Sequence, residues 1–142
     1  MRIWDINPGY LSRQHLLGEH RELHAIVSIL RRGRRGYSRH PETLRWTGHG
    51  WALRQRHRLL AAEMRLRGFD ERSPVNLRTH RGRWPERYLD SPCAQYVLLA
   101  AKYQDAQQGR IPLPHNIQQL AMRHKEQYLM VSTALGELEA WL

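Results

Sequence analysis

Apolar residues recur at helical spacing between residues 14 and 30 of the chain. At about 100° per residue, five of them gather on one side of a helix: Leu16, Leu23, Ile26, Val27 and Leu30. His15, Glu19 and Glu22 fall at the edge of that side, so we expect their side chains to be half-buried. Partial burial disfavours a charged carboxylate and raises its pKa, as a general acid working near neutral pH requires.

Helix-end signals place this helix and predict three more. Ser12 is suited to cap the first helix, which should run over residues 12–30 and stop at the glycines of the stretch 31–36. Ser91-Pro92 is a typical helix start, and Gly68 is a typical residue just after a helix end. The further helices are predicted over residues 52–67, 92–108 and 116–140.

The segments between these helices carry turn residues and arginines. Residues 37–51 contain a proline and two glycines and indicate a long loop, while residues 73–88 indicate an irregular basic segment. Trp46 and Trp51 in or beside the first of these segments are suited to plug a core, with base stacking as the alternative. The sequence predicts an all-α fold: a compact single domain over residues 1–142, with three to four helices and long basic loops.

The charge balance favours a polyanionic partner. The formal net charge is +10, and all but two of the 23 basic residues are arginines, which bind phosphate in a bidentate way. A membrane surface is the competing polyanion, but no apolar run is long enough to span a bilayer and no signal-peptide pattern is present. The lone Cys93 cannot form an internal disulfide. We therefore expect a cytoplasmic, nucleoid-associated monomer that does not bind membranes.

Nine histidines raise the question of a metal ion. His20 and His24, at positions i and i+4, could form half of a zinc site. No cysteine cluster and no His-Glu-x-x-His pattern completes it, so the sequence predicts no metal and no cofactor. The sequence also lacks a phosphate-cradling glycine motif and a Ser-His-Asp signature, so nothing in it supports nucleotide hydrolysis or serine-type chemistry.

Two blocks of residues carry a family resemblance. The first is Gln14-His15-Leu16 with Glu19 and Arg21-Glu22-Leu23, and the second is Leu53-Arg54-x-Arg56 with Leu60, Ala62-Glu63 and Arg67-Gly68-Phe69. In this order they resemble the pyrimidine-dimer DNA glycosylases and AP lyases of the phage endonuclease V type. The resemblance covers about residues 1–108, and the predicted helix over 116–140 departs from it.

The resemblance implies a DNA-repair enzyme that acts on double-stranded DNA with damaged bases or abasic sites. An N-terminal amine attacks C1′ of the damaged nucleotide and forms a Schiff base, which β-elimination resolves. An α-amino group suits this role because its ordinary pKa is about 7.7–8.0. Alignment on Arg21-Glu22-Leu23 places that amine on Met1, which the bulky Arg2 should cause to be retained, and the catalytic acid on Glu22. Residues expected to contact DNA are Arg2, His15, Arg21, Arg31, Arg32, Arg34, Arg35, Arg54 and Lys102.

Other interpretations stay open at the level of sequence. The protein could be a related lyase for another lesion or for abasic sites alone, because lesion choice depends on pocket shape and base extrusion. It could also be a non-catalytic nucleic-acid-binding protein in which Glu22 merely pairs with Arg21 or Arg2. Glu19 is the rival for the catalytic role, since it shares the helix margin with Glu22.

Overall fold

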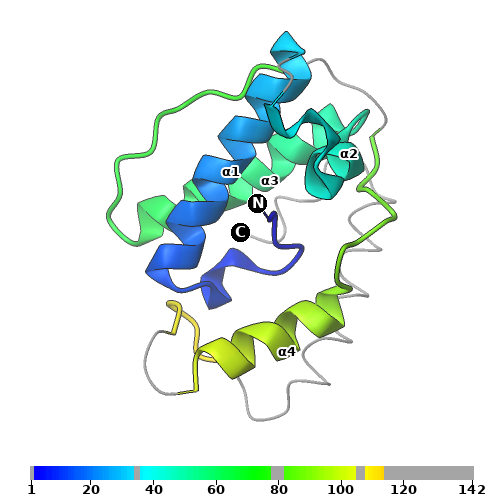
Figure 1. Ribbon diagram of the computed structural model, residues 1–142. Helices are drawn as coiled ribbons and strands as arrows, with labels where there is room; N and C mark the ends of the chain where they lie inside the picture. The colour runs from blue at the N-terminus through cyan, green and yellow to red at the C-terminus, as the bar shows by residue number, and fades with distance from the viewer. Residues whose placement is uncertain (1, 34–35, 78–81, 105–107, 114–142) are drawn as a thin grey trace.

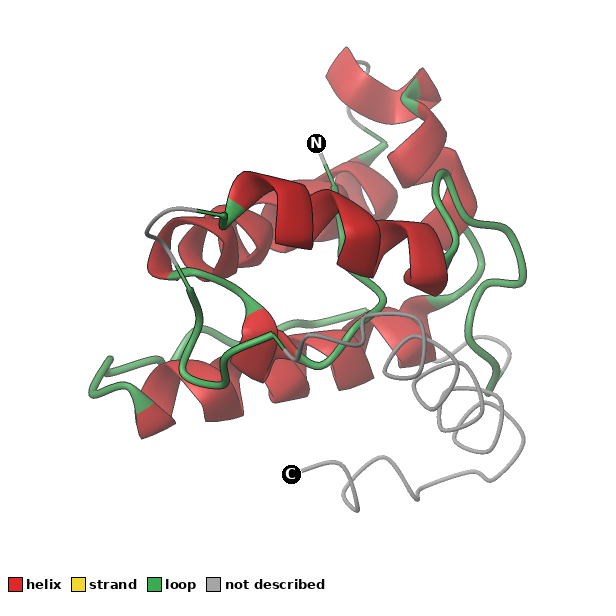
Figure 2. Cartoon of the chain, turned by 90° about the horizontal axis from the view of Figure 1, so that it is seen from below, coloured by secondary structure: helices red, strands yellow, loops and turns green. Residues whose placement is uncertain are grey.

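A computed structural model describes residues 2–33, 36–77, 82–104 and 108–113 of the chain. Within these ranges the elements are the α-helices α1 (Arg13–Arg32), α2 (Pro41–Trp46), α3 (Gly50–Leu66) and α4 (Pro92–Lys102), with 3-10 turns at Pro8–Tyr10 and Gly36–Arg39. No strand occurs in this described part of the chain, which Figure 2 shows as helices joined by loops. The predicted all-α fold is confirmed.

The two helix starts predicted from serine caps are confirmed. The Ser12 hydroxyl accepts a hydrogen bond from the backbone N–H of His15 at 3.3 Å, and α1 ends at Gly33, whose φ of 63° is left-handed. Ser91 caps α4 in the same way, with Pro92 in the first turn. That helix ends at Lys102, however, and not at residue 108 as predicted.

Helix α2 corrects the prediction of a long loop over residues 37–51. A proline is tolerated in the first turn of a helix, where its missing N–H would have no partner, and Pro41 opens α2 in this position. The ring nitrogen Nδ1 of His40 caps the helix by accepting from the backbone N–H of Glu42 at 3.1 Å. Residues 73–77 and 82–88, in contrast, contain no helix or strand, as predicted.

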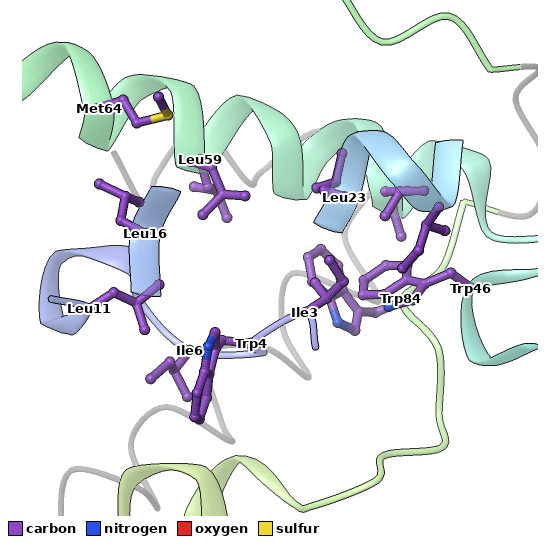
Figure 3. Close-up of a cluster of buried hydrophobic side chains, with 14 of the residues drawn as sticks. Ile3, Trp4, Ile6, Leu11, Leu16, Leu23, Trp46, Leu59, Met64 and Trp84 are labelled. Atoms are coloured by element: carbon purple, nitrogen blue, oxygen red, sulfur yellow. The ribbon is translucent and has the colours of Figure 1, made fainter. Parts of the chain in front are cut away.

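Helices α1 and α3 pack side by side, and the N-terminal segment lies between this pair and α4 (Figure 1). One apolar core joins them. Figure 3 shows Ile3, Trp46 and Trp84 toward the end of the core near Leu23, while Leu11 lies toward the end near Leu16. Trp46 is 0% exposed, so the interpretation of this residue as a core plug is confirmed.

The N-terminal segment is buried over four consecutive residues, Ile3 to Ile6. Asp5 is the polar member, and its carboxylate accepts from three buried side chains. They are Arg45 of α2, at 2.9–3.1 Å, Trp84, through its indole N–H at 2.8 Å, and Gln95 of α4, at 3.0 Å. A carboxylate satisfied by several donors can be buried, and this one fastens the segment to three other parts of the fold.

Two sequence predictions fall outside these ranges. The predicted helix over 116–140 lies outside the described residues, and the extent of the domain over 1–142 stays a prediction. No described helix has both the length and the apolar character needed to cross a membrane.

Candidate active site

Glu22 lies on an open margin of α1. His15, Gly18 and Glu22 follow one another at spacings of three and four residues, so they share one strip of the helix surface. The Glu22 side chain is half-buried, and no residue in the described ranges hydrogen-bonds to it or forms an ion pair with it. A methyl group added at Gly18 would meet nothing within 4 Å. The strip therefore has a carboxylate beside a position that no other described residue covers.

Glu19 does not lie at the edge of the apolar stripe, as the periodicity predicted, but inside the core. Its carboxylate accepts from Nε and Nη2 of Arg56 on α3, at 2.6 and 2.8 Å, and both side chains are 0% exposed. Burial raises the pKa of the Glu19 carboxyl, while the Arg56 guanidinium acts against that rise. Arg56 keeps its proton, so a neutral Glu19 would leave a buried cation unbalanced. We therefore treat this pair as ionised.

The same pair holds the N-terminal segment against α1. Nη1 of Arg56 donates to the carbonyl of Ile6 at 2.5 Å, and the backbone N–H of Trp4 lies close enough to the Glu19 carboxylate to act against the rise of its pKa. Arg2 is half-buried, lies over the Trp4 ring and donates to Asp90 at 2.5 Å. The alternative pairing of Arg2 with Glu22 is therefore not found. Met1 lies outside the described residues.

His15 connects the Glu22 margin to α4. Its Nδ1 is hydrogen-bonded to the hydroxyl of Tyr103, which also accepts from the backbone N–H of Ser12 at 2.9 Å. Its ring lies 5.6 Å from that of Trp4. Burial, and next the positive charge of nearby Lys102, hold the pKa of His15 below its ordinary value. A neutral His15 thus lies at the junction of α1, α4 and the N-terminal segment.

The residues predicted to contact DNA fall into separate groups. Arg2, His15 and Lys102 lie around the N-terminal segment, and Arg21 is exposed on α1 beside Glu22. Arg31 and Arg32 are exposed at the far end of α1, about 14 Å along the helix axis from Glu22 at 1.5 Å per residue. Arg54 is half-buried on α3, and Arg34 and Arg35 lie outside the described residues.

Four side chains that could hold a metal ion come together on the other side of α1. His20 and His24 of α1 meet His57 of α3 and Glu71 of the following segment, with one ligand atom of each within 4.8 Å of the others. Burial, and next the neighbouring histidines, lower the pKa of His57 to about 4. The sequence showed only the two histidines on α1. His57 fitted the apolar stripe of its helix, and spacing alone did not indicate Glu71.

Comparison with known proteins identifies the family. A family model described as pyrimidine dimer DNA glycosylase matches residues 1–77. The chain belongs to this family. The matched part holds α1, α2 and α3, and with them Glu22 and the N-terminal segment. Membership implies a DNA glycosylase that binds damaged DNA. No curated protein and no solved structure matches the chain significantly.

Proposed function

We propose that the protein is a DNA glycosylase with AP-lyase activity whose nucleophile is the α-amino group of Met1. The amine nitrogen bonds to C1′ of the damaged nucleotide as the glycosidic bond breaks and the base departs with the bonding electrons. Loss of a proton and opening of the sugar ring then give the imine. Removal of a C2′ proton expels the 3′ phosphate by β-elimination, which cuts the strand.

The observation that carries this proposal is the way in which the N-terminal segment is fixed. Burying four consecutive residues at a chain start, with Asp5 bonded to three partners and the Ile6 carbonyl bonded to Arg56, restricts a segment that is usually mobile. A catalytic amine needs such restriction, because an imine forms only when the nitrogen is held within bonding reach of C1′.

Chain length supports Glu22 as the partner of this amine. The nitrogen of Met1 lies three residues before that of Trp4, a reach of at most about 11 Å. The backbone N–H of Trp4 lies near the Glu19 carboxylate, and Glu22 lies about 4.5 Å farther along the helix axis. The length of the segment is therefore compatible with an amine that acts beside the Glu22 carboxylate.

The surroundings of Glu22 fit the role of the acid and base. Its carboxylate has no bonding partner among the described residues, so it is available to a substrate, whereas Glu19 is occupied by Arg56. A half-buried carboxylate can stabilise the cationic sugar and imine and can move the protons of ring opening and elimination. We therefore assign the catalytic role to Glu22 and a structural role to Glu19.

Borohydride trapping on duplex DNA with an abasic site tests the proposal, because only an amine that forms an imine becomes covalently attached. We expect the untagged protein to be trapped, and an otherwise identical protein with an acetylated N-terminus to bind the same DNA without being trapped. Equal trapping of both forms would exclude the Met1 amine. Absence of trapping with the untagged protein would exclude the imine mechanism altogether.

A further inference from the structure

We propose that His20, His24, His57 and Glu71 form a structural binding site for a divalent transition-metal ion of the zinc type. This site is independent of the proposed lyase mechanism. Its ligands come from α1, from α3 and from the segment that follows α3, so an ion bound there would fasten three parts of the chain together.

The separations between the ligand atoms are close to those of a tetrahedral site. Zinc binds imidazole nitrogens and carboxylate oxygens at about 2.0–2.2 Å, which places neighbouring ligands of a tetrahedron about 3.4 Å apart. Nε2 of His20 lies 3.2 Å from Oε2 of Glu71, close to this spacing, and Nε2 of His57 lies 3.6 Å from Oε1, the other oxygen of the same carboxylate. All four ligand atoms lie within 4.8 Å of one another. A contraction of at most about 1.4 Å at the widest separation would complete the site.

Hydrogen bonds within this cluster leave one of its buried nitrogen atoms without a partner. The Ser73 hydroxyl donates to Glu71 and lies 2.8 Å from Nε2 of His24 and 3.3 Å from Nε2 of His20. Nε2 of His57 is buried without a hydrogen-bond partner, on a residue that is only 8% exposed. A buried polar atom without a partner is destabilising. A cation coordinated by Nε2 of His57, together with the carboxylate and the two other imidazoles, would supply the missing partner.

The carboxylate is also oriented as a metal ligand is expected to be. Ser73 donates to Oε1 of Glu71 through both its hydroxyl and its backbone N–H, the latter at 2.7 Å. The Arg65 guanidinium donates to the backbone carbonyl of Glu71 at 3.2 and 3.3 Å. Such outer contacts fix the direction of a coordinating group and strengthen metal sites. Metal binding requires the Ser73 hydroxyl to release both His20 and His24 while it keeps Glu71.

The place of the cluster argues for a structural ion and not a catalytic one. His20 and His24 are each two positions from Glu22, which places them 200° around the helix, on the opposite side of α1 from the proposed catalytic carboxylate. Four protein ligands also fill a tetrahedral zinc site and leave no open position for water or substrate. Three imidazoles and one carboxylate suit zinc, whereas magnesium and calcium prefer sites built from oxygen ligands.

Metal titration of the full chain, expressed without a histidine tag and stripped with a chelator, tests this proposal. We expect one Zn²⁺ per chain by calorimetry, one Co²⁺ with the strong visible absorption of four-coordinate cobalt, and a higher midpoint of thermal unfolding with Zn²⁺. His57→Gln and Glu71→Gln should each weaken binding about 100-fold or more, whereas His49→Gln, outside the cluster, should leave it unchanged.

Two results would overturn the proposal. One is a wild-type chain that binds neither Zn²⁺ nor Co²⁺ with one-to-one stoichiometry. The range tested should extend to metal-ion concentrations about 100 times those that fill structural zinc sites. The other is binding that persists unchanged in His57→Gln and Glu71→Gln. Circular dichroism of each variant shows whether it is folded, and the wild-type titration decides the question even if a variant fails to fold. Borohydride trapping of the stripped and loaded protein tests the lyase separately.

Discussion

Replacing each of two glutamates on α1 by glutamine separates structure from chemistry. Glu19 and Glu22 are three residues apart on the same helix, and glutamine keeps the shape of both while removing the charge. Glu19→Gln leaves the Arg56 guanidinium buried without its counter-charge, and breaking a buried pair in this way costs about 3–5 kcal/mol. Glu22→Gln removes no hydrogen bond or ion pair among the described residues, so it should change the unfolding free energy by less than about 0.5 kcal/mol.

The loss of stability expected for Glu19→Gln is large enough to measure. Domains of this size are stable by about 5–15 kcal/mol, so Glu19→Gln removes a large fraction of the total. At roughly 2–4 °C per kcal/mol, the midpoint of thermal unfolding should fall by about 10 °C. Urea unfolding and thermal melts of the wild type and both variants measure these changes, and cleavage of abasic DNA measures activity. We expect Glu22→Gln to fold normally and to lose the lyase step.

Either of two outcomes would refute this reasoning. A loss of less than about 1 kcal/mol in Glu19→Gln would mean that Glu19 is neutral in the fold, since an amide then replaces a protonated carboxyl at little cost. Wild-type turnover of abasic DNA by Glu22→Gln would remove Glu22 from the mechanism.

Three further predictions concern other residues of α1. Gly18→Ala should raise the unfolding free energy by about 0.5–1 kcal/mol, because its methyl group meets no atom of the described residues, yet slow trapping about tenfold or more by crowding the DNA beside Glu22; unchanged trapping would contradict this. Because the pKa of His15 is lowered in the fold, its contribution to stability is present above about pH 6.5 and is lost as the pH falls. Thermal melts should therefore show that His15→Gln loses less stability between pH 7.5 and pH 5.5 than the wild type does. An equal loss in the two proteins would count against this role of His15. Replacing Arg31 and Arg32 together by glutamine should reduce the slope of log affinity for duplex DNA against log salt by up to about 2, with Arg72→Gln as an exposed control; an unchanged slope would exclude both residues from phosphate contact.

The sequence predicted those features that depend on neighbouring residues. The stripe of α1, its Ser12 cap and the Ser91 cap of α4 are local patterns, and the structure confirms each of them. Helix α2 was missed because Pro41 was taken as a loop residue, although a proline in the first turn is also a helix-start signal. An interpretation of His40 as its cap would have found it.

The sequence could not show contacts between residues far apart in the chain. The periodicity placed Glu19 at the edge of a stripe, but Arg56, 37 residues away on α3, draws it into the core. In the same way, His20 and His24 gave half of a site, and only the packing of α3 against α1 brings His57 to them. Helical spacing reports the side on which a residue lies, whereas its partner depends on how the helices pack.

The position of the covalent link after borohydride trapping tests the central claim most directly. Trapped protein is digested with a protease, and mass spectrometry locates the residue that carries the sugar remnant. We predict that the remnant is on the α-amino group of Met1. A remnant on Lys102 or Lys125, the two lysines of the chain, would contradict the account and would identify the amine that acts in its place.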